Sequence, residues 1–258
     1  MQAMKKDVNI PLNRVEGDLE ILVDIEEGVI TEARSIGTMF RGFEELMLGR
    51  GALDGLVITP RICGICSLTH LNAAAEALDA ICQITPPDNA RRLRNVALMA
   101  ETVQNDIRHS ALMFMVDFAQ ARAYREAPFF TEALRRYDPL KGSIAHEEIK
   151  ETKKMPQIVA IIGGQWPHTS FMVPGGVASM PDTTRLLQCN MIVKQFRTWY
   201  EHTVLGCSID TWQQVRSLAD FDAWLGERRE HREGEVGFLV RCLRESAMAR
   251  LGGASNRY

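Results

Sequence analysis

Two cysteines three residues apart, Cys63 and Cys66, constrain this chain more than any other feature of its sequence. The spacing brings two soft thiolates to one side of a turn, within reach of a single metal ion, and Gly64 between them allows a tight turn. The same spacing occurs in half of a structural zinc site and in thioredoxin-like redox pairs. The sequence has no second close Cys or His pair to complete a zinc site, and it lacks the βαβ pattern of the redox proteins.

The residues after the cysteines are expected to form a helix. The segment LTHLNAAAEALDAI, residues 68–81, is rich in alanine, has apolar residues at helical spacing and contains neither Pro nor Gly. Cys63 and Cys66 would then lie at or just before a helix N-terminus. Unpaired amides and the helix dipole at such a position favour the thiolate, which is the form that binds metal.

The rest of the chain predicts an α+β fold that is predominantly helical. Residues 7–38 alternate apolar and polar side chains around Glu27-Gly28, which is typical of a β-hairpin, and residues 41–49 have a short helical pattern. Further helical patterns cover residues 88–122, 145–162, 182–205, 219–226 and 236–250. We expect an N-terminal β-hairpin region with a short helix, residues 1–60, packed on a bundle of long helices, residues 61–258, that carries the cysteine motif.

Charge and composition argue against several classes of protein. The net charge is −3 and no basic cluster is present, so nucleic-acid binding is not expected. Charges interrupt the apolar runs well short of the ~20 residues that a membrane span needs, and the N-terminus lacks the apolar core of a secretory signal. Membrane contact is therefore expected only through partners. The six cysteines do not form a disulfide framework, which fits a reducing cytoplasm.

Three further residues are candidates for a site, and each has an ordinary alternative. His70 lies one helical turn after Cys66 and would reach its sulfur, or it is simply a helix-capping or core histidine. Glu16, on the first predicted strand, is a candidate proton carrier if it is buried, or the partner of Arg14 in an ion pair. Glu44 would supply oxygen to a hard cation such as Mg²⁺, or it faces solvent on a short helix.

Two other segments have the composition of a site. Asp106 and His109 lie three residues apart on the long predicted helix and would line a polar site or form a surface pair. Residues 163–168, GGQWPH, combine Trp, Pro and His in one loop, which is unusual for a simple connection. A packed turn is the alternative for this loop.

The order of these segments is more informative than any one of them. RVEG, FRGFE, RICGICSLTH, a long helix with a polar step, GGQWPH and PGGV follow one another along nearly the whole chain. Together they resemble the large subunit of nickel–iron hydrogenases, and the chain is similar to the N-terminal half of that subunit. The opening NRVEGDLEI is most similar to the branch that contains cytoplasmic uptake and hydrogen-sensing enzymes.

This resemblance implies a nickel–iron centre held by four cysteines, two from each of two C-x2-C motifs, with carbon monoxide and cyanide on the iron. In this chain Cys63 would be a terminal nickel ligand and Cys66 a bridge between the metals. The implied activity is the reversible heterolytic splitting of H2. Electrons would leave through iron–sulfur clusters in a small subunit, because this chain has no further cluster of cysteines.

The resemblance also implies roles for the other candidates. Glu16 matches the glutamate that accepts protons from a nickel-bound thiolate, and His70 matches the histidine beside the bridging sulfur. Glu44 matches a ligand of a buried Mg²⁺. Asp106 matches, to within one position, a carboxylate close to the open metal site.

One departure from the family pattern means that this chain alone is not expected to hold a complete nickel–iron centre. The second C-x2-C motif, which the family carries near its C-terminus, has no counterpart here, and Cys189, Cys207 and Cys242 are isolated. We expect the missing ligands to come from another chain or segment that corresponds to the C-terminal half. Two alternatives remain open: an inactive scaffold subunit related to respiratory complex I, and a zinc-binding module.

Overall fold

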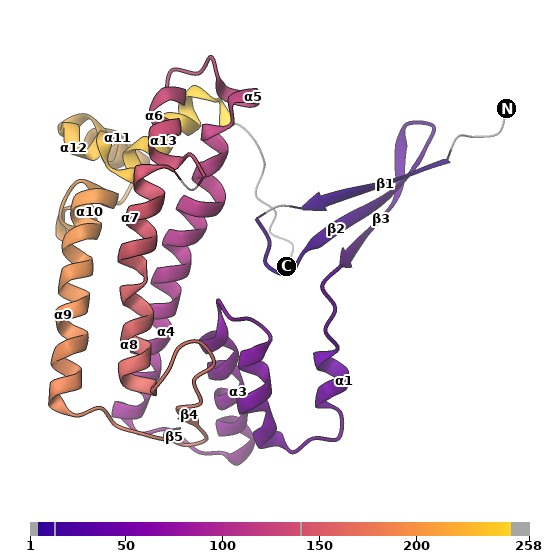
Figure 1. The fold of residues 1–258 in the computed structure, drawn as a ribbon, viewed down its shortest axis with the longest axis vertical. Coiled ribbons are helices and arrows are strands. Elements are labelled where there is room, and N and C mark those ends of the chain that lie inside the picture. The colour runs from indigo at the N-terminus through magenta and orange to yellow at the C-terminus, as the bar shows by residue number, and fades with distance from the viewer. Residues whose placement is uncertain (1–4, 13, 140, 249–258) are drawn as a thin grey trace. The chain divides into compact units, whose positions relative to one another are not determined.

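The computed structural model describes residues 5–12, 14–139 and 141–248, which form two compact units, Met1–Gly51 and Ala52–Tyr258. The protein is mostly helical with a small antiparallel sheet (Figure 1), so the predicted fold class is confirmed. Residues 52–60, which the sequence grouped with the β-rich region, lie in the helical unit. No helix within the described ranges is long and apolar enough to cross a bilayer.

The N-terminal unit contains a three-stranded antiparallel meander of β1 (Lys5–Leu12), β2 (Leu19–Glu26) and β3 (Val29–Gly37), followed by α1 (Phe43–Met47). Glu27 and Gly28 form the predicted hairpin turn, with φ of 51° and 83°. Two positive φ angles match the right-handed twist of the flanking strands. Glu26 consequently pairs with Val29 across the turn.

The helical unit begins with η1 (Ala52–Asp54), α2 (Gly55–Ile58) and η2 (Thr59–Arg61), which lead into α3 (Ser67–Cys82). After α4 (Asp88–Arg108), a π-helical segment η3 (His109–Phe114) and a 3-10 segment η4 (Met115–Ala119) continue in the same direction. The predicted helix 88–122 is therefore helical to Ala119, but it changes pitch twice.

The second half of this unit contains α5 (Ala121–Tyr124), α6 (Phe130–Tyr137), α7 (Ser143–Thr152), α8 (Lys154–Gly163), the strands β4 (Met172–Val173) and β5 (Gly176–Val177), α9 (Thr183–Trp199), the π-helical η5 (Tyr200–Leu205), α10 (Ile209–Trp212), α11 (Leu218–Glu227), α12 (Arg229–Glu233) and α13 (Glu235–Glu245). The predicted helix 145–162 is two helices that meet at Lys153. Pro156 lies in the first turn of α8, where its missing N–H costs no hydrogen bond, so the helix restarts there.

Two apolar clusters hold the helices together. The larger joins α3, α4, α8 and α9 through buried residues such as Leu71, Ala97, Ile158 and Phe196. In Figure 1 the helices α4, α8 and α9 run side by side. The second cluster joins η4, α6 and α13 around Phe118, Phe129, Tyr137 and Phe238.

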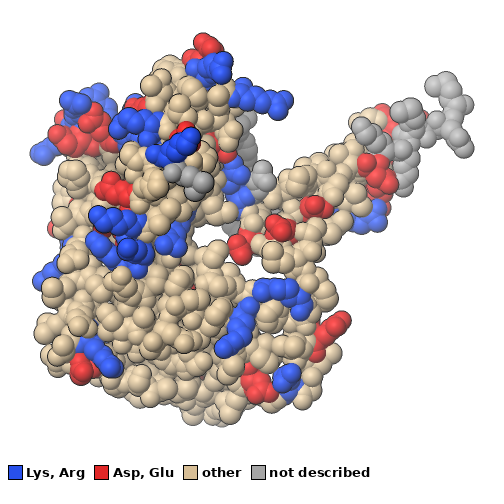
Figure 2. All heavy atoms as spheres, in the orientation of Figure 1, with Lys and Arg blue, Asp and Glu red and all other residues tan. Residues whose placement is uncertain are grey.

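The surface of the helical unit is uneven in charge. Figure 2 shows Lys, Arg, Asp and Glu gathered together at the end that contains α6 and α11–α13. On the same face, the end that contains α3 and the β4–β5 strands is largely uncharged. The cysteine motif belongs to the uncharged end, directly before α3.

Candidate functional site

Cys63 and Cys66 lie in the turn that leads into α3, as the sequence predicts. Cys66 is the N-cap residue of the helix, and its backbone N–H donates to the Sγ atom of Cys63 over 3.2 Å. Cys63 is 7% exposed, and Cys66 is half-buried. All six cysteines are free thiols. The two sulfurs therefore lie on the same side of one turn, and a group placed there would contact both.

A buried glutamate from α4 caps the N-terminus of α3. Glu101, 1% exposed, accepts hydrogen bonds from the backbone N–H of Leu68 at 3.1 and 3.0 Å and of Thr69 at 3.1 Å. Its Oε1 also accepts from the hydroxyl of Ser67 at 3.3 Å. The carboxylate occupies the amides that the sequence assigned to a cysteine thiolate. Of the amides expected to stabilise a thiolate, those of Leu68 and Thr69 are therefore occupied, whereas the N–H of Cys66 does donate to Cys63 Sγ.

The acidity of Cys66 follows from this arrangement. Burial, the hydrogen bond and charge of Cys63, and the charge of Glu101 together raise the pKa of the Cys66 thiol to about 12. A metal that binds this sulfur would displace its proton, because the thiolate is the ligand form.

The loop 163–169 packs on the cysteine turn from both sides. The ring Nδ1 of His168 lies 2.8 Å from the carbonyl oxygen of Pro60, which precedes the motif, and its backbone N–H donates to Ser67 Oγ, which follows it. The indole N–H of Trp166 donates to Glu101 Oε1 over 3.1 Å. This loop therefore belongs to the site, and it fixes the position of the cysteine turn.

The next segment, PGGV, residues 174–177, is held by hydrogen bonds to side chains of α3 and α4. The buried carboxylate of Asp79 on α3 accepts from the backbone N–H of Gly175 and pairs with Arg94 on α4 at 2.6 Å. Arg94 also donates to the carbonyl oxygens of Val173 and Gly176. Burial acts to raise the pKa of Asp79, but the hydrogen bonds from Arg94 and Gly175 and the charge of Arg94 outweigh it and lower this pKa.

His70 lies in the first turn of α3, close to the cysteines in the chain. Its backbone N–H donates to the carbonyl oxygen of Cys66 over 3.4 Å, and its own carbonyl accepts from the hydroxyl of Thr59. The residue is half-buried. Its ring makes no hydrogen bond to the residues that the structure describes. The predicted contact with the Cys66 sulfur stays a prediction.

Asn105, and not Asp106, reaches the cysteine turn from α4. The Nδ2 atom of Asn105 donates to the carbonyl oxygen of Ile65, between the two cysteines, over 3.3 Å. Asp106 is exposed and lines cavities beside Tyr200, whose pKa is raised by burial and by the charge of Asp106. Side chains of consecutive helical residues point about 100° apart. Asn105 and Asp106 therefore lie on different faces of α4.

Glu16 and Glu44 belong to the N-terminal unit. Glu16 lies in the turn between β1 and β2, not on a strand, and Glu44 lies in the first turn of α1. Both side chains are exposed. The burial on which the proton-carrier interpretation of Glu16 depends is therefore not present, and its role and that of Glu44 stay predictions.

Cys63 and Cys66 are the two candidate metal ligands that the structure brings together. No group of three or more His, Cys, Asp or Glu side chains within the described ranges is arranged to hold a metal ion. Cys63 and Cys66 offer two soft donors, which suit nickel, iron or zinc better than hard cations. Further ligands would have to come from outside the described residues.

Glu101 and Asn105 are the site residues that sequence reasoning missed. Both lie one turn apart on α4, and Glu101 falls on the buried stripe with Ala97, Ala100 and Gln104. A carboxylate on the apolar face of a predicted helix needs a partner, because an unpaired buried charge is costly. The position of Glu101 on the apolar face could have marked it as a site residue. It could not show that its partners are the amides of α3.

Comparison with known proteins finds similarity to hydrogenases over the segment that contains the cysteine turn. A family model described as "Nickel-dependent hydrogenase" matches residues 41–136, which include the cysteine turn, α3 and α4. The periplasmic [NiFeSe] hydrogenase large subunit of Desulfomicrobium baculatum is 30% identical over 191 residues, covering 69% of this chain and 37% of that protein. This chain is similar to nickel-dependent hydrogenase large subunits.

Other hydrogenases extend the comparison. The hydrogenase-2 large chain of Escherichia coli (strain K12) is 30% identical over 176 residues, or 64% of this chain and 30% of that one. The structure of the Ni-Fe-Se hydrogenase from D. vulgaris Hildenborough matches with a TM-score of 0.60 and 28% identity, covering 77% of this chain and 42% of the hydrogenase chain. This chain thus spans about a third of the length of the curated hydrogenases that it matches.

Proposed function

We propose that this chain forms the N-terminal part of a nickel–iron hydrogenase large subunit and supplies Cys63 and Cys66 to its metal centre. The observation that carries the proposal is the paired cysteine turn at the start of α3, fixed by Glu101 and by the loop of Trp166 and His168. The family relationship covers the same segment.

The donor set supports this centre in part. Two thiolates on one turn fit a soft metal, and they leave coordination positions for ligands from a second C-x2-C motif on another chain or segment. By likeness to the family, the iron would carry carbon monoxide and cyanide. When bound, the centre supplies the redox chemistry for reversible heterolytic splitting of H2.

The residues of this chain would position the ligands and move the proton. Glu101 and His168 hold the turn, so that the two sulfurs keep a fixed separation. We infer that His70 orients the Cys66 sulfur, that Glu16 accepts the proton and that Glu44 binds Mg²⁺ or a similar structural cation. Asp106 is retained as a candidate near the centre, although Asn105 is the residue on α4 that contacts the turn.

The proposal requires partners. An iron–sulfur small subunit would carry the electrons, because two thiolates do not hold a cluster. Membrane contact would occur through these partners, and no nucleic acid is involved. We propose a cytoplasmic location, in the uptake or sensory branch; cell fractionation decides this point, since one relative is named periplasmic.

Metal analysis and an H2-dependent dye-reduction assay test the function on the complex purified with its partners. We expect nickel and iron together and dye reduction that depends on H2. Both metals without activity would favour the inactive scaffold. Zinc alone would favour the zinc-binding module, and absence of nickel and iron would rule out the proposed centre.

A further inference from the structure

A cavity in the helical unit, which Cys63 and Cys66 do not line, contains a second group of buried polar side chains. A cavity of about 410 Å³ opens between α7, α13 and the two π-helical segments η3 and η5. Its walls are mainly apolar, with Phe114, Met115, Val204 and Leu239 among them. π-Helical turns are rare and occur often at functional sites. Two of them on one cavity mark it as a place where the helices depart from regular packing.

The same cavity is lined by polar groups that lack partners. Glu148 Oε2, Glu235 Oε2 and the hydroxyl of Tyr137 are buried, and none has a hydrogen-bond partner among the described residues. Glu148 is only 3% exposed. Buried polar groups are almost always satisfied by protein or by ordered water. Three of them around one cavity therefore indicate that water enters it.

The surroundings of Glu148 favour a neutral carboxyl group. Burial, and secondly the charge of the neighbouring Glu147, raise the pKa of Glu148 to about 8. Asp106 and His109 reach the same cavity from the end of α4 and the start of η3. Tyr200 reaches it from η5. No cation pairs with the Glu148 carboxyl group among the described residues.

Two cations on the helices that contact α7 have other partners. Arg108 on α4 donates to the hydroxyl of Thr152 over 2.9 Å, and Lys154 on α8 pairs with Glu151. From α9, the uncharged indole of Trp199 donates to Glu147. The Glu148 carboxyl group is therefore neutralised by binding a proton and not by pairing with a cation.

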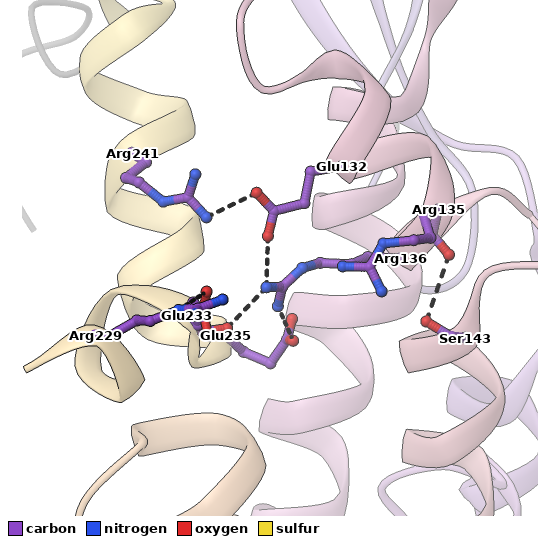
Figure 3. A network of polar contacts seen from close by, with 8 residues as sticks. All are labelled: Glu132, Arg135, Arg136, Ser143, Arg229, Glu233, Glu235 and Arg241. Carbon is purple, nitrogen blue, oxygen red and sulfur yellow. Dashed lines mark hydrogen bonds and ion pairs between the residues drawn. The ribbon is translucent and has the colours of Figure 1, made fainter.

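Glu235 connects this cavity to a second one. It also lines a charged cavity of about 580 Å³ that contains Glu132, Arg229 and His202. Figure 3 shows Arg136 between Glu132 and Glu235, and the Arg136 Nη1 atom donates to Glu235 Oε1 over 2.7 Å. Burial raises the pKa of Glu235, and the charge of Glu132 adds to this effect. The charge and hydrogen bond of Arg136 and the charge of Arg135 lower the pKa but do not outweigh burial. The pKa of Glu235 is therefore raised to about 7.

We propose that the cavity between η3 and η5 takes up ordered water and holds an exchangeable proton on Glu148, with Glu235 as the carboxyl group that passes it to the charged cavity. The proton moves from the carboxyl oxygen to water and on to the Glu235 carboxylate. No bond to carbon changes, and no oxidant or reductant is needed. The proposal stands whether or not the chain acts on H2.

Infrared spectroscopy of the full chain, titrated from pH 6 to 9.5, tests this site. We expect a carboxylic acid C=O band above the amide I region that disappears with a midpoint near pH 8. The band should move to lower frequency in D2O, because water in the cavity exchanges the proton. The proposal would be overturned if the wild-type protein had no such band at pH 6, or if the frequency of the band did not change in D2O.

Variants assign the band. Glu148→Gln keeps the size of the neutral acid and should remove the band, whereas Glu126→Gln, at an exposed position, should leave it. Glu147→Gln removes the neighbouring charge and should lower the midpoint. A band that persists undiminished in E148Q would show that Glu148 is not the proton holder.

Discussion

At the scale of single residues, Glu101 decides how the cysteine turn is built. Its carboxylate lies in the interior and satisfies the first amides of α3, which otherwise would have no partner. It also accepts from Trp166, so one side chain joins α3, α4 and the loop 163–169. This position explains why the cysteines are held in place without disulfides.

Replacing Glu101 with Ala should therefore destabilise the protein strongly. The substitution removes the acceptor of the buried Leu68 N–H and of the less buried Thr69 N–H and Trp166 indole N–H. We expect a loss of roughly 2–4 kcal/mol in the free energy of unfolding, measured by urea denaturation. Glu76→Ala, at an exposed position of α3, should change it by less than about 0.5 kcal/mol. Equal losses for the two variants would contradict the capping role.

Glu148 gives the stability a pH dependence of defined sign. Its pKa rises from 4.5 to about 8 on folding, so the native state binds more protons than the unfolded state between these values. The contribution of this group is greatest below pH 4.5 and is lost as the pH rises toward 8. From pH 5.5 to 8.5 we expect a loss of roughly 1–3 kcal/mol. Thermal unfolding should show this slope in the wild type and a flatter one in E148Q; parallel slopes would contradict it.

The residue scale is also where the sequence is least informative. The spacing of Cys63 and Cys66 predicts their common turn without further information. It does not distinguish Asn105 from Asp106, because a helical pattern gives the periodicity but not the phase to within one residue. The partner of Glu101 is far away in the chain, so no local pattern identifies it.

At the scale of elements, most helices and the hairpin follow from local chemistry. Glu27-Gly28 predicts its turn because both residues tolerate positive φ. The change from α to π at His109 and at Tyr200 could not be predicted, since each π-helical segment has only 6 residues and is too short to show a periodicity of its own. The break between α7 and α8 at Lys153 could have been predicted from Pro156, which favours a new helix start. The position of the loop 163–177 depends on long-range contacts to α3 and α4.

The Asp79–Arg94 pair tests those contacts. Arg94→Met should destabilise the protein by about 3 kcal/mol or more, because it leaves the Asp79 carboxylate buried without its counter-charge. Asp79→Leu should cost a similar amount. The double variant should cost less than the sum of the two, measured as a coupling free energy by denaturation. Additive losses would show that the two side chains do not act as a pair.

At the scale of the whole molecule, the candidate residues that the sequence singles out belong to two separate units. The cysteine turn, His70 and Glu101 belong to the helical unit, while Glu16 and Glu44 belong to the N-terminal unit. The family relationship covers the helical part that carries the cysteines. Two thiolates within the described residues cannot complete a nickel–iron centre, so the account depends on ligands from elsewhere.

X-ray absorption at the nickel edge, on the complex purified with its partners, tests the central claim most directly. The account predicts nickel bound to sulfur in the wild type, and fewer sulfur neighbours or no nickel in Cys63→Ser. Cys82→Ser, at an exposed cysteine on α3, should leave the spectrum unchanged. A spectrum without nickel–sulfur scattering, or one that Cys63→Ser leaves unaltered, would contradict the claim that this turn holds the metal.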